Sequence, residues 1–274
     1  MSTSEGYVLN TLQTPEPIKP LYDAIDRGVT ARDELEAELG FDEERLSDGL
    51  NGLRQYRMIG KEDYEFHTVE YAFDTGDDDR DFRLTILHNL ARECTGPDWG
   101  KQSVVLLIYK YMLEHDVQYF ENNDTGLYDR IDDWYRSELS YDPQSSQGSI
   151  TLNDPKFVNW SRQANFLGLV YKTTGREHAV RPTPELIEAS VRLAADGDDY
   201  LGIREYFEWL QTNLLPVTLQ EGTVPAPLAR LLFELVRDGT IRLVERGDAG
   251  AVGLDDVPRR SGIDTEANTI EVLS

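Results

Sequence analysis

The chain has 274 residues, with 27 Lys and Arg against 51 Asp and Glu, so its formal net charge is −24 and its pI is about 4.4. Aromatic residues make up 10% of the sequence, which is enough to build an apolar core and excludes global disorder. A single cysteine, Cys94, excludes a disulfide framework and a cysteine metal cluster. The longest apolar run, near Val104–Ile108, is too short to span a bilayer. No apolar signal core stands near Met1, and we expect a cytoplasmic protein without membrane contact.

The basic residues are of an unusual kind, because only six of the 27 are lysines. A surface rich in carboxylates and poor in lysine resembles the proteins of haloarchaea, which accumulate salt in the cytoplasm. Carboxylates keep such surfaces hydrated. We therefore interpret the acidity as an adaptation to the solvent, which leaves the kind of partner open.

After an N-terminal extension (1–16), residues 17–73 predict three helices. The first stops at Gly28, the second ends at Gly40, and the third starts near Asp42 and closes at 58–60. The third helix carries apolar residues at i, i+4 and i+7, which we expect to be buried: Leu46, Leu50 and Leu53.

A short strand pair is predicted to follow this third helix, over a run of aromatic and apolar residues: Tyr64, Phe66, Val69, Tyr71 and Phe73. Residues 74–80 then form an acidic linker. Its carboxylates are compatible with a cation site or with a solvated hinge, and we favour the hinge.

The second predicted segment spans 81–183. A lead-in helix is followed by an amphipathic helix over 101–116, a helix that ends near Leu139, and a polar loop over 140–149. The next helix is capped at Asn153 or Asp154, with Pro155 in its first turn. It places three aromatic residues in the core, Phe157, Trp160 and Phe166. A hairpin that turns at Gly175 completes the segment.

The third predicted segment spans 184–254. It contains helices near 186–193 and 202–215, a further helix that ends before Gly239, and a hairpin that turns at 247–250. The first two segments contain three helices followed by a hairpin, but a complete second helix of this order is not evident here. The tail, 255–274, ends in an apolar run that predicts either a short added strand or disorder.

Two stretches carry a family resemblance, TARDELEAELGFDEERLSDGLNGLRQYRMIG and NWSRQANFLGLVYKTTGREHAV. They resemble the helix-turn-helix core, and the recognition helix with its wing, of the winged helix-turn-helix superfamily. This resemblance implies a mainly α fold with small β-wings (α+β), built from two or three tandem winged-helix units. The long polar loop before the second stretch departs from a tight helix-turn-helix.

Local charge singles out residues 155–182, which hold five bases and one acid, whereas the chain average predicts about three bases and about five acids. A recognition helix and wing with such a charge could contact bases and phosphates of DNA. The alternative is a wing that packs on another unit or subunit. The candidate DNA-binding residues are Lys156, Asn159, Arg162, Gln163, Lys172, Arg176 and Arg181.

The third helix of the first segment is a weaker candidate, because bases and acids balance between Asp42 and Lys61. Asn51 and Arg54 could nevertheless face DNA. A role in dimerisation or in binding another protein is equally compatible with this composition.

No motif for catalysis is recognisable, and the four histidines and Cys94 lack the spacing of metal ligands. We therefore expect no enzyme, no metal and no cofactor. The first hypothesis is a protein that binds double-stranded DNA, either as a transcription regulator or as the DNA-recognition subunit of a larger system. The alternative is an adaptor subunit of a defence or chromosome-maintenance complex, which binds proteins or forms a homodimer and does not contact DNA.

The charge predicts that stability depends on salt. With a net charge of −24, the folded chain repels itself most strongly in dilute buffer. We expect partial unfolding or aggregation at low salt, and a melting temperature that rises toward molar potassium chloride. Circular dichroism melts across a salt series measure this, and a melting temperature indifferent to salt would contradict the halophilic interpretation.

Overall fold

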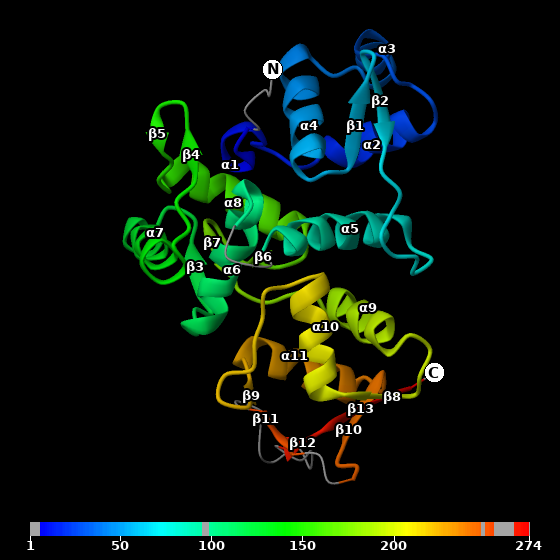
Figure 1. Cartoon of the computed structure of the whole chain (residues 1–274), viewed down its shortest axis with the longest axis vertical. Coiled ribbons are helices and arrows are strands. Elements are labelled where there is room, and N and C mark those ends of the chain that lie inside the picture. Colours follow the sequence, from blue (N-terminus) through cyan, green and yellow to red (C-terminus); the bar gives the residue numbers. More distant parts are fainter. Residues whose placement is uncertain (1–5, 95–98, 248–249, 255–265, 274) are drawn as a thin grey trace. The chain divides into compact units, whose positions relative to one another are not determined.

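The computed structural model describes residues 6–94, 99–247, 250–254 and 266–273. Within these ranges, helices are mixed with short strands that form five small sheets rather than one continuous sheet (Figure 1). This confirms the α+β fold class. None of the described helices combines the length and the apolar character needed to span a bilayer. The chain divides into an N-terminal unit (up to 105, with 121–167) and a C-terminal unit (106–120, with 168 onward).

The N-terminal unit starts with a one-turn helix, three longer helices and a hairpin. The αL conformation of Gly40 (φ 62°) ends the third of these helices. The Asp42 carboxylate begins the fourth by accepting a hydrogen bond from the Arg45 amide at 2.8 Å. The elements are α1 (Val8–Thr11), α2 (Ile18–Asp26), α3 (Arg32–Leu39), α4 (Glu43–Gln55), β1 (Ile59–Glu62) and β2 (Glu65–Thr68).

The hairpin β1–β2 is shorter than predicted. Glu62 pairs with Glu65, so the strands are joined by a two-residue turn in which Asp63 and Tyr64 both have positive φ (43° and 73°). This is the arrangement of a type I′ turn, whose twist matches that of the strands it joins. The predicted extent was wrong, because 69–73 follow β2 and 59–60 begin β1 instead of closing a helix.

The acidic stretch 74–80 is exposed at most positions, as a solvated segment is, but its last part belongs to a helix. Helix α5 (Asp78–Glu93) begins inside it, and the Asp77 carboxylate caps the helix by accepting from the Arg80 amide at 3.0 Å. Asp81 is buried and accepts from the Thr75 amide at 3.0 Å and the Thr75 hydroxyl at 2.6 Å. These carboxylates fix the start of a helix, so the predicted linker boundary was wrong.

The rest of the N-terminal unit includes α8, whose Trp160 donates to the carbonyl of Val105 at 2.9 Å. The predicted polar loop before this helix contains a hairpin of its own, which corrects the loop assignment. The elements are the 3-10 helix η1 (Lys101–Ser103), the start of α6 (Val104–Glu114), α7 (Thr125–Leu139), β4 (Gln144–Ser145), β5 (Gly148–Ser149) and α8 (Asp154–Phe166).

The predicted start and core of α8 are largely confirmed. The Asn153 side chain caps the helix by accepting from the Lys156 amide at 3.2 Å, with Pro155 in the first turn. Phe157 and Trp160 are fully buried, as are the predicted leucines of α4. Phe166 is only half-buried, so that part of the prediction was wrong.

Helix α1 packs against both α4 and α8, so residues 7–12 belong to the core rather than to an extension. Val8, Leu9 and Leu12 have no exposed surface. Leu12 sits against Gly52 of α4, where a Cβ atom would lie 2.9 Å from its Cδ1. A glycine at this position therefore permits the close approach of α1 and α4.

The C-terminal unit contains most of α6 and three further helices, each associated with short strands. Its three sheets have the strand orders β3-β7-β6, β10-β13-β8 and β12-β11-β9. The elements are β3 (Tyr119–Glu121), β6 (Tyr171–Lys172), β7 (Glu177–Ala179), α9 (Pro184–Ala195), β8 (Tyr200–Gly202), α10 (Ile203–Asn213), β9 (Thr223–Val224), α11 (Ala226–Arg237), β10 (Ile241–Val244), β11 (Val252–Leu254), β12 (Glu266–Ala267) and β13 (Thr269–Val272).

Strand β13 corrects the predicted end of the third segment. It lies between β10 and β8, with Ile270 fully buried and paired with Leu243 on one side and Leu201 on the other. The apolar run in the tail is thus a strand, the central one of its sheet, and the segment does not stop at Leu254. Residues 255–265 of the predicted tail lie outside the described ranges. The predicted helix near 202–215 is α10, and it is the second of three helices, so the order that was not evident from sequence is complete.

The packing of α1 on α4 predicts the effect of Gly52→Ala. The added methyl group would collide with Leu12, and overpacking of this kind costs about 1–3 kcal/mol. The gain in helix propensity, about 1 kcal/mol, offsets only part of this loss. Gly126→Ala in α7 is the matched control, since the nearest atoms to its Cβ lie 3.5 Å away. Urea denaturation should show a loss of stability for Gly52→Ala alone, and equal midpoints for both variants would contradict the packing.

Candidate interaction surfaces

Helix α8 was expected to present Asn159 and Gln163 to DNA, and both side chains are buried instead. The Asn159 amide donates to the carbonyl of Leu9 at 3.0 Å. The Gln163 amide donates to the carbonyl of Leu12 at 2.8 Å, and its oxygen accepts from the Tyr56 hydroxyl at 2.7 Å. The expectation was wrong for these two residues, because their hydrogen-bonding groups already serve α1 and α4.

The burial of α1 favours its packing over α8. Burial of three aliphatic side chains of this size stabilises by about 5 kcal/mol in total. Gln102 adds contacts to the main chain of the segment, accepting from the Val8 amide at 2.9 Å and donating to the Gly6 carbonyl at 2.7 Å. A contribution of this size is comparable to the whole stability of many domains. Release of α1 to expose the polar face of α8 would therefore compete with folding itself.

The two predicted bases of α8 have different surroundings. Arg162 is exposed, and its guanidinium donates to the carbonyl of Gln13 at 3.2 Å. Lys156 is half-buried, and this burial lowers the pKa of its ammonium group. Arg162 is therefore the predicted α8 base with the greater access to a ligand.

Helix α4 presents an acidic surface. Arg54 is exposed and Asn51 half-buried, as candidates for contact require. However, Glu44 and Asp48 lie on the same face at helical spacing. Burial, with a contribution from the Glu44 carboxylate, raises the pKa of Asp48. Two carboxylates on this face repel the phosphates of a nucleic acid.

The remaining predicted bases lie in the C-terminal unit. Lys172 and Arg176 are exposed on the hairpin formed by β6 and β7. Arg181 is half-buried and forms an ion pair with Glu234 of α11. This pairing directs Arg181 into the unit, which leaves Lys172 and Arg176 as the exposed pair.

Exposed aromatic side chains form a second surface feature, which the sequence analysis did not identify. The large apolar residues that are exposed in the described ranges all lie on strands or directly beside them: Tyr64, Val69, Tyr119, Tyr171 and Tyr200. Tyr64 is the extreme, at 87% exposure, in the turn between β1 and β2. A tyrosine in the short gap between two strands is a sequence signal that could have indicated it.

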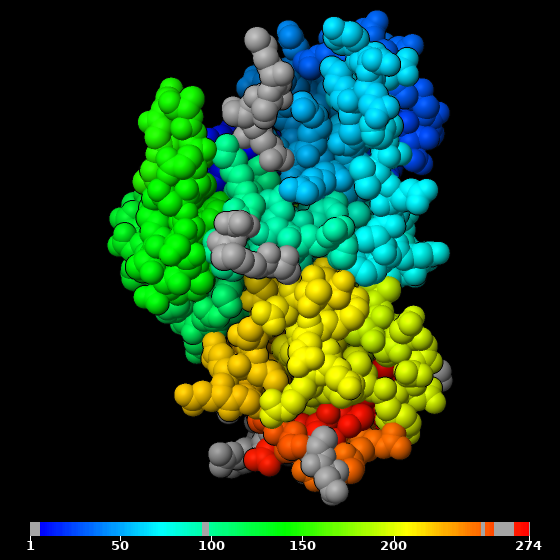
Figure 2. Space-filling view, viewed as in Figure 1, coloured from blue at the N-terminus to red at the C-terminus, as the bar shows by residue number. Residues whose placement is uncertain are grey.

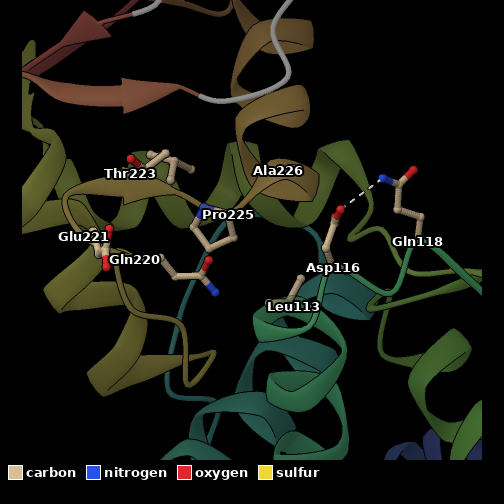
Figure 3. Close-up of a pocket in the computed structure, with 9 residues that line it drawn as sticks. Leu113, Asp116, Gln118, Gln220, Glu221, Thr223, Pro225 and Ala226 are labelled. Carbon is tan, nitrogen blue, oxygen red and sulfur yellow. Dashed lines mark hydrogen bonds between the residues drawn. The ribbon is translucent and has the colours of Figure 1, made fainter. Parts of the chain in front are cut away.

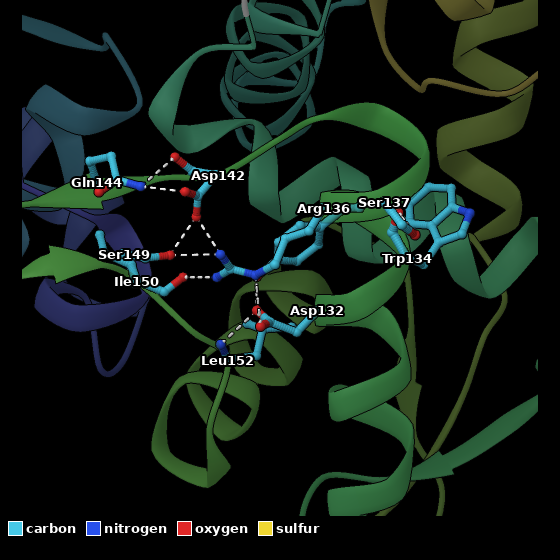
Figure 4. Close-up of polar contacts among 10 residues, drawn as sticks. Asp132, Trp134, Arg136, Ser137, Asp142, Gln144, Ser149, Ile150 and Leu152 are labelled. Atoms are coloured by element: carbon cyan, nitrogen blue, oxygen red, sulfur yellow. Dashed lines mark hydrogen bonds and ion pairs between the residues drawn. The ribbon is translucent and has the colours of Figure 1, made fainter.

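The hairpin β4–β5 stands out from the surface of the N-terminal unit (Figure 2). Its base is fixed by Arg136 of α7, whose guanidinium donates to the Asp132 carboxylate at 3.0 Å and to the Ile150 carbonyl at 2.7 Å (Figure 4). Asp142 and the Ser149 hydroxyl complete this network. The base of the hairpin is thus anchored to α7, and Gln144–Ser149 carries no charged side chain.

A pocket of about 690 Å³ opens at the start of α11 in the C-terminal unit. The carboxylates of Asp116 and Glu221 and the amides of Gln118 and Gln220 line it (Figure 3). Such a lining could accept a small cationic or hydroxylated molecule. No group of three or more His, Cys, Asp or Glu side chains within the described ranges is placed to hold a metal ion.

Comparison with known proteins identifies no relative. No family model matches the chain, no curated protein matches it, and no solved structure matches it.

The position of Tyr64 predicts that removal of its side chain does not destabilise the fold. A tyrosine in the left-handed region costs about 1 kcal/mol relative to glycine, and this side chain is almost fully exposed. Tyr64→Gly should therefore raise the melting temperature by roughly 2–4 °C. Tyr171→Gly is the matched control and should lower it, because glycine weakens a regular strand. A fall in melting temperature for Tyr64→Gly would show that the ring stabilises the fold.

Proposed function

We propose that the chain is a non-catalytic adaptor, built from tandem winged-helix units, that binds protein partners through its β-hairpins. The topology supports the winged-helix assignment. In the sheet β10-β13-β8, one strand (β8) follows the first helix α9 and two (β10 and β13) follow the third helix α11, with the last strand central; β9, β11 and β12 form a separate sheet. Apart from the inserted hairpin β4–β5, the order α6, β3, α7, α8, β6, β7 repeats this pattern, and α2, α3, α4, β1, β2 follows it without the first strand. This order is typical of winged helices.

The observation that carries the adaptor proposal is the position of the exposed aromatic residues. Tyrosine is enriched at protein interfaces, where a few aromatic anchors supply most of the binding energy. Here the exposed tyrosines belong to strands or hairpin turns, while the third helices offer little that could read DNA. Helix α4 is acidic, α8 is covered by α1, and Arg237 of α11 pairs with Asp238.

Binding to double-stranded DNA is the second candidate, as a regulator or as the recognition subunit of a larger system. The excess of bases over 155–182 favours it, with Arg162, Lys172 and Arg176 exposed. Three bases could contact phosphates, but the buried side chains of Asn159 and Gln163 leave few groups for reading base edges.

One set of variants tests both candidates. Tyr64, Tyr119, Tyr171 and Tyr200 are changed singly to serine, and binding to the purified products of the genes flanking its own is measured by calorimetry. At least one tyrosine variant should weaken binding about 30-fold, which corresponds to the loss of an anchor of about 2 kcal/mol. Arg54→Ala and Arg162→Ala are the controls on α4 and α8, and they should leave the affinity unchanged.

The same preparations are titrated with duplex DNA from the protein's own locus and with random duplex, with fluorescence anisotropy as the readout. An adaptor shows no binding that distinguishes the two duplexes. Sequence-dependent binding that disappears in the Arg162→Ala, Lys172→Ala, Arg176→Ala triple variant would favour DNA recognition and overturn the adaptor proposal.

A further inference from the structure

The turn between β1 and β2 stands clear of the N-terminal unit. Residues 61–65, the tip of this hairpin, are exposed without interruption, whereas Ile59 and Phe66 on either side of them are buried. Phe66 also donates its amide to the carbonyl of Thr30 at 3.0 Å. The side chains of the tip are thus presented to solvent from a hairpin that is anchored in the unit.

Tyr64 occupies a position of this turn that favours another residue. Its φ of 73° lies in the left-handed region, where a type I′ turn usually carries glycine, and a tyrosine there costs stability. Burial does not offset this cost, since the side chain is 87% exposed. A residue that breaks a local preference without a gain for the fold points to a function at that position.

A second unfavourable feature lies beside the turn. Glu62 and Glu65 are directly paired across β1 and β2, so both carboxylates lie on the same face of the hairpin, where like charges in opposite positions destabilise the strand pair. Neither belongs to an ion pair among the residues that the structure describes. His67, the next side chain on this face, packs over Gly60. An acidic surface requires exposed carboxylates, but it does not require two of them directly opposite each other.

The ring and the carboxylate pair lie on opposite sides of the narrow tip. Lys61 shares the inner face with Phe66, and its ammonium group lies 5.6 Å from the centre of the Tyr64 ring. Glu62 and Glu65 lie on the other face. A partner that receives the tip in a cleft therefore meets the ring on one side and the carboxylates on the other. An apolar wall binds the ring, and a Lys or Arg side chain between the two carboxylates removes their repulsion.

We propose that the tip of the β1–β2 hairpin inserts into a cleft of a protein partner, where Tyr64 contacts an apolar wall and a basic side chain binds between Glu62 and Glu65. This proposal rests on the adaptor function and names the chemistry of its partner. A nucleic acid is disfavoured, because the three carboxylates of the tip repel phosphates and Lys61 is its one base. A metal ion does not fit either, since no group of three ligating side chains within the described ranges is placed for one.

The first measurement is the stability of the full chain. The double variant Glu62→Gln, Glu65→Gln keeps the size of both side chains and removes their repulsion, so its melting temperature should rise. Asp133→Asn, Glu138→Gln is the matched control, because it makes the same change of charge at two exposed positions of α7. Circular dichroism in one buffer should show a larger rise for the tip variant than for the control.

The second measurement is the affinity of the same proteins for the purified products of the flanking genes, by calorimetry at constant salt. Tyr64→Ser should weaken binding about 30-fold, and Glu62→Gln, Glu65→Gln at least tenfold. Tyr64→Phe, which keeps the ring, and the α7 control should bind as the wild type does. A gain in stability combined with a loss of affinity, at the same two glutamates, is the result that the proposal requires.

The outcomes separate this proposal from the adaptor function. If a flanking-gene product binds the tip variants as tightly as the wild type but loses affinity for Tyr119→Ser, Tyr171→Ser or Tyr200→Ser, the adaptor function stands and this proposal fails. If none of the products binds the wild type, the adaptor function fails and this proposal with it. An equal loss of affinity in the α7 control would show general attraction between charges and would overturn the site at the tip.

Two further results would overturn the proposal. Equal melting temperatures of the tip variant and the control would show that the two glutamates do not repel each other. A dimer in analytical ultracentrifugation that Tyr64→Ser dissociates would make a second copy of the chain the occupant. A labelled single-stranded oligonucleotide that binds more tightly than the flanking-gene products, and is lost in Tyr64→Ser, would assign the tip to nucleic acid and overturn it equally.

Discussion

The N-terminal unit depends on the insertion of α1 between α4 and α8. A four-residue helix satisfies few of its own carbonyls, so side-chain amides of its neighbours must do so. Asn159, Gln163 and Gln102 supply these donors, and Gly52 supplies the space for Leu12. Since Asn159 and Gln163 lie on α8, the helix that was expected to face DNA, the packing of the unit and its access to DNA are coupled. The side chains that bind α1 are therefore not accessible to the base edges of DNA.

Under the proposed adaptor function, this constraint shifts recognition from helices to hairpins. A hairpin exposes both its turn and an edge, and it can carry an aromatic side chain without disturbing the core beneath it. Carboxylates over most of the chain leave only limited regions that an acidic partner could approach closely. The bases of the β6–β7 hairpin form such a region.

Periodicity predicted the helices of this chain well, because the spacing of Leu46, Leu50 and Leu53 and the cap at Asn153 act locally. Periodicity could not show which distant segment of the chain covers the polar face of a helix. Asn159 and Gln163 look like solvent-facing residues until α1, about 150 residues away in sequence, is placed against them. The exposed bases Arg162, Lys172 and Arg176 were predictable from charge. The tyrosine surface was not, since strand alternation in segments of two or three residues is too short to assign faces.

The position of strand β13 determines when the sheet of the C-terminal unit can form during synthesis of the chain. The strand between β10 and β8 is contributed by residues 269–272, so neither neighbour has its partner until almost all of the described chain has been synthesised. Contacts of such long sequence separation form late and slow folding. A truncation before residue 269 would remove the middle of the sheet rather than its edge, and would leave β8 and β10 as two unpaired strands open to association with other chains.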